Sequence, residues 1–233
     1  MTVYQNPRFR ERLIPGADLR ELAITVGVDM RDLDLTNADL SCSYLKTANL
    51  SGSTLVNANL QGVKMGSTDF DRQSTLLHDC DLSGADLTEA DLGDVHSMRA
   101  NFTSATLHKC RAQGALIAEA TFTAADLTES AIVNSNLERS ILDDVKAARA
   151  DFTSCRLAGA SFRRADLSAA SLANTDLTGA NFTGANLAGA NFGNAVLDNI
   201  ILPSGNQFLG MTRFTRKSRS QQLAGEFGMR FDW

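Results

Sequence analysis

The chain repeats a five-residue pattern over most of its length. Between Ala150 and Phe192 it reads ADFTS CRLAG ASFRR ADLSA ASLAN TDLTG ANFTG ANLAG ANF. Each unit has a small residue, usually Asp or Asn next, then Leu or Phe, and then two small or polar residues. We call the Leu or Phe the centre, and the small residue two positions before it the partner. Neither a helix nor an alternating strand has a five-residue cycle, so the pattern indicates a solenoid.

This repeat resembles the consensus A(D/N)LXX of the pentapeptide-repeat family. The resemblance implies an all-β fold, a right-handed quadrilateral parallel β-helix in which four pentapeptides form one coil. It also implies that the centre points inward. The small partner then shares the interior of a narrow coil with the centre, while the Asp or Asn caps backbone groups at the corner.

Centres that lie twenty residues apart sort by size, as stacking in such a coil requires. Each side chain must fit the ones above and below it at a spacing of about 4.8 Å. Phe is absent from the series that begin at Leu77 and Leu87. The two series that contain it are Leu82, Phe102, Phe122, Leu142, Phe162, Phe182, Leu202 and Leu92, Ala112, Ile132, Phe152, Leu172, Phe192.

The phase of the repeat predicts the domain organisation. Residues 1–16 carry no repeat and are expected to cap the open strand edges of the first coil. The repeat spans 17–202, with a one-residue slip before Met30. Counting gives 37 pentapeptides, or roughly nine coils and a rod about 43 Å long.

The centres run in phase from Met30 to Phe70, but the next centre, Leu77, follows Phe70 by seven residues instead of five. This spacing predicts an external loop near residues 71–76 that holds two extra residues. Deleting residues 71–76 is expected to leave the fold intact. The weak centres Ser97, Ala112 and Ala147 are expected to kink or flatten the rod locally.

The repeat stops at Pro203, and residues 203–233 are predicted to cap the last coil. A short helix is expected at Arg216–Gly225. The aromatic content of this segment exceeds what one cap needs, which predicts a homodimer interface. Its aromatic residues are Phe208, Phe214, Phe227, Phe231 and Trp233.

Charge separates the repeat from both ends of the chain. Residues 31–203 carry 13 Lys and Arg against 21 Asp and Glu, a net charge of −8, while residues 1–30 are neutral and the tail is +3. A slim acidic rod has the shape and sign of a DNA duplex and would be steered toward a positively charged DNA channel. Alternatively, Asp is only the turn residue of the repeat and its charge keeps the rod soluble; charge alone favours this interpretation. The candidate acidic surface comprises Asp86, Asp91, Asp126, Asp151 and Asp166.

The motifs of common enzyme classes are missing from the sequence. It has no Gly-rich phosphate loop, H-E-x-x-H or nucleophile elbow, so we expect no enzyme activity, cofactor or metal. Cys80, Cys110 and Cys155 are partner residues, expected to be buried thiols rather than disulfides or ligands. The three histidines, His78, His96 and His108, show no ligand spacing and are expected at the surface.

The chain is also expected to lie in the cytoplasm, away from membranes. No run approaches the roughly 18 apolar residues of a membrane span, and the first residues lack the apolar core of a signal peptide.

Two stretches resemble the Qnr-type quinolone-resistance proteins more specifically. Residues 70–74, FDRQS, are similar to the FYDRES stretch at which those proteins carry their first external loop. Residues 110–115, CRAQGA, match a segment of the same proteins and depart from the repeat consensus. Leu197-Asp198-Asn199 is similar to the Leu-Asp-Asn before the Qnr C-terminal helix. This resemblance covers chiefly residues 70–115.

The Qnr resemblance implies a homodimeric, DNA-mimicking rod that binds DNA gyrase and topoisomerase IV and protects them from fluoroquinolones, without binding nucleic acid itself. It assigns a role in protection to the loop residues Asp71, Arg72, Gln73 and Ser74. The longer second Qnr loop is expected after CRAQGA, yet the centres from Ile117 onward stay in phase. Binding without strong drug protection therefore stays open. The alternative function is a structural or regulatory scaffold for another partner.

Overall fold

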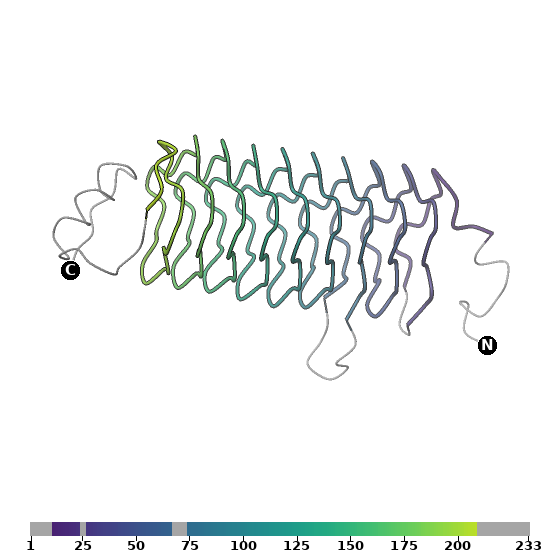
Figure 1. Ribbon diagram of the computed structural model, residues 1–233. Helices are drawn as coiled ribbons and strands as arrows, with labels where there is room; N and C mark the ends of the chain where they lie inside the picture. Colours follow the sequence, from purple (N-terminus) through teal and green to yellow (C-terminus); the bar gives the residue numbers. More distant parts are fainter. Residues whose placement is uncertain (1–10, 24–26, 67–73, 209–233) are drawn as a thin grey trace.

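The backbone forms a rod of stacked rectangular coils (Figure 1). The computed structural model describes residues 11–23, 27–66 and 74–208. Within these ranges there is no helix, and the β structure consists of isolated bridges, one per pentapeptide, rather than extended strands. The bridges between successive coils are all parallel and fall into four series. The described chain is therefore a pentapeptide-type β-helix with four walls, as the repeat predicts.

We number the walls in the order in which the chain visits them and define each by its bridge residues. Wall 1 contains Asp18, Asp39, Asn59, Asp86, Thr106, Asp126, Lys146, Asp166 and Asn186. Wall 2 contains Ala23, Tyr44, Lys64, Asp91, Arg111, Ala131, Asp151, Ser171 and Asn191. Wall 3 contains Asp29, Asn49, Leu76, His96, Leu116, Asn136, Arg156, Asp176 and Val196. Wall 4 contains Asp34, Thr54, Asp81, Asn101, Thr121, Ile141, Ser161, Asn181 and Ile201.

The pentapeptide around Leu35 shows how the backbone groups are satisfied. The N–H of Leu35 donates to the carbonyl of Thr54 in the next coil at 2.8 Å, and the N–H of Ala38 donates back to Leu35 at 3.0 Å to close the corner. The Asp34 carboxylate accepts the N–H of Thr36 at 3.0 Å. Asp and Asn before the centre thus cap the corner, as predicted.

From Leu19 to Leu197, the second residue after each centre has a positive φ wherever that residue is described, and this forms the corner. Gly179 and Asn194, for example, have φ of 70° and 57°. Charged residues occupy the same position elsewhere, for example Glu129 at 58°. The corner therefore accepts side chains other than glycine despite its left-handed backbone.

The core is a column of centres and partners buried inside the four walls. Phe102 and Phe122 stack with ring centroids 4.7 Å apart, and Phe162 and Phe182 stack at 5.2 Å. Phe152 meets Phe162 edge to face at 6.2 Å. The twenty-residue stacking and the restriction of Phe to two faces are therefore confirmed.

The three weak centres are buried and stay in register. Ser97, Ala112 and Ala147 each share a coil with a Phe on wall 4, namely Phe102, Phe122 and Phe162 respectively. A small centre offsets the volume of a ring in the same cross-section, which keeps the interior close-packed. The offset is not general, because the coil of Phe182 has Leu at its other three centres.

The two phase breaks both fall between wall 2 and wall 3. Ala23 pairs with Tyr44, a step of twenty-one, whereas Asp29 pairs with Asn49, a step of twenty, so the predicted one-residue slip is confirmed. Asn49 then pairs with Leu76, a step of twenty-seven. The second insertion therefore adds seven residues, not the two that were predicted.

The predicted boundary of the loop near 71–76 is wrong at its end. Thr75 is fully buried and Leu76 is a wall 3 bridge residue, so both belong to the coil. Leu77, rather than Phe70, is the centre that follows Met65 on the next wall. The error arose because Phe70 fits the pattern by composition; it lies outside the described residues.

Both ends of the described stack contribute to its core. Leu13 is 4% exposed, and the N–H of Ala17 bonds to Ile14 across a corner, so coil-like structure begins inside the predicted cap of 1–16. At the other end, Ile201 forms an antiparallel bridge with Gln207, which occupies part of the last open edge. The predicted helix at 216–225 lies outside the described residues. The right-handed sense and the coil number stay predictions.

Candidate protein-binding surfaces

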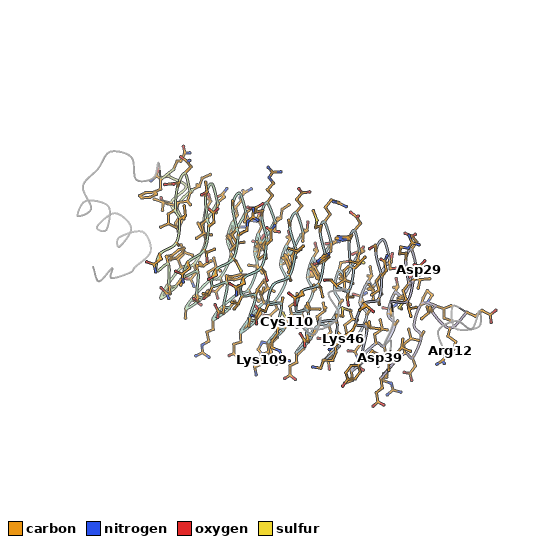
Figure 2. All side chains as sticks on the ribbon, turned by 90° about the horizontal axis from the view of Figure 1, so that it is seen from below. Arg12, Asp29, Asp39, Lys46, Lys109 and Cys110 are labelled. Carbon is orange, nitrogen blue, oxygen red and sulfur yellow. The ribbon has the colours of Figure 1, made fainter. Side chains whose placement is uncertain are left out.

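Negative charge is concentrated on wall 1. Its nine bridge residues include five Asp and one Lys, whereas wall 2 has two residues of each sign. Wall 3 has two Asp and one Arg, and wall 4 has two Asp. In Figure 2, Asp39 of wall 1 lies along one edge of the rod, and Asp29 of wall 3 lies along the opposite edge. The four walls therefore present different charges to a partner.

The structure brings together three of the five predicted acidic residues. Asp86, Asp126 and Asp166 lie on wall 1, one in every second coil. Each is half-buried and uses one oxygen to accept the backbone N–H two residues on, at 2.9–3.0 Å. Among the described residues, no cationic nitrogen lies within 4.0 Å of any of these three carboxylates. Each carboxylate thus serves a structural turn without being neutralised by a described cation.

Hydrogen bonding keeps Asp86 ionised. Burial alone would raise the pKa of its carboxyl group, but hydrogen bonds from the Gln61 side chain and from Thr88 outweigh burial and lower the pKa. The Gln61 amide donates to Oδ2 of Asp86 at 2.6 Å. Asp86 therefore carries its charge at neutral pH.

The other two predicted acidic residues lie on the neighbouring wall 2. Asp91 is 3.9 Å from the Arg111 guanidinium of the next coil. Asp151 caps its own corner by accepting the N–H of Thr153 at 2.9 Å. Wall 2 has no net charge among its bridge residues, so the predicted acidic surface divides into an acidic wall and a neutral one.

Many of the remaining charges pair across coils at the corners. Arg99 donates two hydrogen bonds to Asp79, at 2.7 and 2.8 Å, and Arg164 pairs with Asp144 at 2.6 Å. The hydrogen bonds from Arg99 hold the pKa of Asp79 below its usual value. The sequence contains the signal for these pairs, since each acid precedes its base by twenty residues, but we did not predict them from it.

The base of the insertion is closed by one buried side chain. The Thr75 hydroxyl lies 2.8 Å from the carbonyl oxygen of Met65, just before the insertion, and 2.9 Å from that of Leu45 in the preceding coil. The predicted loop residue Ser74 is half-buried beside it. Asp71, Arg72 and Gln73 lie outside the described residues.

Phe208 belongs to the core rather than to a free surface. It is 8% exposed, and its N–H donates to the carbonyl of Ile200 at 2.7 Å. Its predicted role in dimerisation is therefore replaced by covering the last coil. The remaining predicted dimerisation residues, Phe214, Phe227, Phe231 and Trp233, lie outside the described residues.

The predicted thiols and histidines lie as expected. Cys80, Cys110 and Cys155 are buried and free, and burial raises the pKa of each thiol to about 12. Cys42 is exposed. The three histidines are half-buried on the outer surface. No helix in the described parts of the chain is long and apolar enough to cross a bilayer.

Two solved structures of other proteins are similar to this fold. HetL, a pentapeptide-repeat protein involved in heterocyst differentiation regulation from the cyanobacterium Nostoc sp. strain PCC 7120, is 27% identical, with a TM-score of 0.55 over 89% of this chain and all of HetL. A trypsin-treated variant of QnrB1, a plasmid-mediated fluoroquinolone resistance protein, is 21% identical, with a TM-score of 0.57 over 91% of this chain and 98% of that one; this likeness concerns the fold alone.

A search of curated protein sequences found no match. The family model for pentapeptide repeats matches in eight copies, which together cover more than half of the chain, at residues 29–66, 80–117, 120–159, 148–184 and 160–199. This chain therefore belongs to the pentapeptide-repeat family.

Proposed function

We propose that this chain is a protein-binding rod that occupies the positively charged DNA channel of a type II topoisomerase, DNA gyrase or topoisomerase IV, and antagonises fluoroquinolones there. The observation that carries the proposal is the concentration of carboxylates on wall 1. Field complementarity of this kind steers association with a basic groove. The insertion between walls 2 and 3 supplies a second contact region, at the position where the Qnr-type proteins carry their first loop.

Charge spacing indicates how strong this mimicry is. Asp86, Asp126 and Asp166 recur every second coil, about 9.6 Å apart at the usual inter-strand spacing. A DNA duplex carries one charge per roughly 1.7 Å of its axis. Wall 1 thus has a lower charge density than a duplex. Binding is therefore expected to be salt-sensitive and weaker than that of DNA.

Drug protection is expected to be weaker than binding. The Qnr resemblance implies a second, longer loop after residue 115, but every bridge from Leu76 to Ile201 keeps a twenty-residue step. No insertion interrupts residues 77–202. We therefore expect this chain to compete with DNA for the enzyme more effectively than it reverses drug action.

The test is a gyrase supercoiling assay with and without ciprofloxacin. The informative variant replaces Asp86, Asp126 and Asp166 by Asn, because the Asn side-chain oxygen can still cap the corner while the charge is lost. The matched control replaces Asp91 and Asp151 of wall 2 in the same way. We expect the wall 1 variant to lose inhibition or rescue while the control retains it. Neither inhibition nor rescue by the unchanged protein at any concentration would reject the proposal.

A second function, a scaffold for a different regulatory partner, is favoured by the likeness to HetL. HetL is involved in regulating differentiation, and the match extends over its whole length. A pull-down from the host that never recovers gyrase or topoisomerase IV subunits would support this alternative. Homodimerisation through residues 203–233 is part of the leading proposal, and a light-scattering mass measurement tests it.

A further inference from the structure

The fold brings two histidines together on wall 3. His96 is a bridge residue paired with Leu76 in the coil before it, and His78 is two residues after Leu76. The two imidazoles therefore lie diagonally across adjacent coils. Their ring centroids are 6.1 Å apart, with 47° between the ring planes. The two histidines are far apart in the sequence, so no local ligand spacing indicates the pair.

This separation is close to that of two imidazoles on one metal ion. A metal–nitrogen distance of about 2.0–2.1 Å puts two ring centroids roughly 5 Å apart in a tetrahedral site, and slightly more than 6 Å apart when the ligands are opposite. The observed 6.1 Å falls within this range. The ring separation is therefore compatible with one ion bound by both imidazoles.

The surroundings leave the pair available and limit it to two protein ligands. Asp79, the nearest carboxylate along the chain, is held by two hydrogen bonds from Arg99. Within the described ranges, no cluster of three or more His, Cys, Asp or Glu could hold a metal. Burial, together with the charge of His96, lowers the pKa of His78, which favours the neutral imidazole that binds metals.

We propose that His78 and His96 form a two-imidazole chelate for a divalent transition-metal ion of the Cu²⁺, Ni²⁺ or Zn²⁺ class, with the remaining coordination positions open to water or to a side chain of a partner. Imidazole is the ligand these ions share. The inference does not depend on the proposed function.

Binding would join two successive coils directly after the insertion. An ion that binds only the folded chain raises its stability by mass action. The pair lies on the outer surface, at the end of the wall 3 segment that Ser74 begins after the insertion. A metal-mediated contact with a partner would form at that place.

The test is calorimetric titration of the full chain with Cu²⁺, Ni²⁺ and Zn²⁺ in a Cys42→Ser background, because the exposed thiol could itself bind these ions. We expect one ion per chain, with affinity reduced by at least about tenfold in His78→Ala and in His96→Ala, since loss of even an outer-shell group has that effect. His108→Ala is the matched control, because His108 is half-buried near wall 1 and makes no ring contact with another histidine in the described residues. It should bind as the parent does.

Thermal unfolding gives a second readout that separates ligation from folding. The ion should raise the melting temperature of the parent and of His108→Ala, but not of the other two variants, while all four melt alike without metal. Two imidazole nitrogens in the Cu²⁺ electron paramagnetic resonance spectrum would support the site. Binding to the His78→Ala/His96→Ala double variant as tight as to the parent, or equal loss in His108→Ala, would overturn it.

Discussion

The stack of coils before the insertion and the stack after it differ in the side chains that fill their interiors and in their regularity. In residues 17–66 the buried centres are Leu and Met, no Phe occurs, and the coil-to-coil step changes twice. In residues 74–202 the step is always twenty, and Phe rings stack through the core. Flexible aliphatic centres accompany irregular coils, whereas rings accompany strict register, because a flat ring has few ways to fit its neighbours.

The difference also identifies where the coil accepts extra chain. Both insertions lie at the corner between walls 2 and 3, one of a single residue and one of seven. A residue added within a wall would turn every following centre outward, since side chains alternate along it. A residue added at a corner leaves the wall pairing unchanged. Corners are therefore the sites for loops, and the walls fix the register.

The largest effect is expected from removing a stacked ring. Phe162→Ala should cost about 3–5 kcal/mol of unfolding free energy, because Phe162 packs against both Phe152 and Phe182. Leu50→Ala, in the irregular stack, is the comparison and should cost less, about 2–3 kcal/mol, because Met30, the flexible centre one coil before it on wall 3, can repack toward it. Urea unfolding followed by circular dichroism measures both. An equal or smaller loss for Phe162 would remove the distinction between the two regions.

A smaller effect is expected at the boundary between the two stacks. Thr75→Val keeps the shape but removes the hydroxyl that reaches the carbonyls of Leu45 and Met65, so it should cost about 1–3 kcal/mol. Thr75→Ser retains the hydroxyl and should recover most of the loss. Limited proteolysis of the same variants should show faster cleavage between residues 66 and 74 only for Val. Unchanged stability in the Val variant would show that this bond does not hold the insertion closed.

Deleting the seven inserted residues should change stability less than the Phe162 or Thr75 substitution does. Removing residues 67–73 restores a step of twenty residues, and loop-length terms predict a change within about 1 kcal/mol. Removing residues 71–76, which the repeat pattern alone suggests is harmless, takes away buried Thr75 and bridge residue Leu76 and should destabilise clearly more. Thermal melts compare the two deletions, and equal melting temperatures would contradict the register.

The reactivity of the thiols distinguishes the two stacks and can be measured at neutral pH without changing stability. Cys42, before the insertion, is exposed, while Cys80, Cys110 and Cys155 after it are buried with pKa values raised to about 12. A disulfide reagent at pH 8 should therefore titrate one thiol in the native chain and all four in denaturant. Cys42→Ser should leave no fast thiol; a fast thiol that remains would contradict the burial.

The three buried thiols are expected to lower the stability of the fold at alkaline pH. Their folded pKa lies above the unfolded value of about 8.5, so their stabilising effect is complete below that pH. It is lost progressively as the pH rises toward 12, because the unfolded chain releases its thiol protons first. Urea midpoints measured from pH 8 upward should fall, and should fall less in Cys110→Ala when each variant is compared with its own midpoint at pH 8.

The sequence by itself determined the interior and the walls. The five-residue pattern predicted which residues are buried, three thiols among them, that rings occupy two faces and that Asp and Asn cap corners. All of these follow from local geometry repeated at a fixed pitch. The same reading failed between Met65 and Leu77. There Phe70 resembles a centre, but only the pairing of Asn49 with Leu76 shows which residue continues the wall.

Only the tertiary structure decided which outward residues meet across the insertion and at the corners. Asp39 and Asn59 join Asp86 on wall 1 because the step across the insertion is twenty-seven residues, and the repeat does not predict the ring contact between His78 and His96. Outward side chains contact side chains of the neighbouring coils. Which residues they contact therefore depends on the number of residues in each coil. A single corner insertion changes that number for every residue around it, and the local pattern does not record the change.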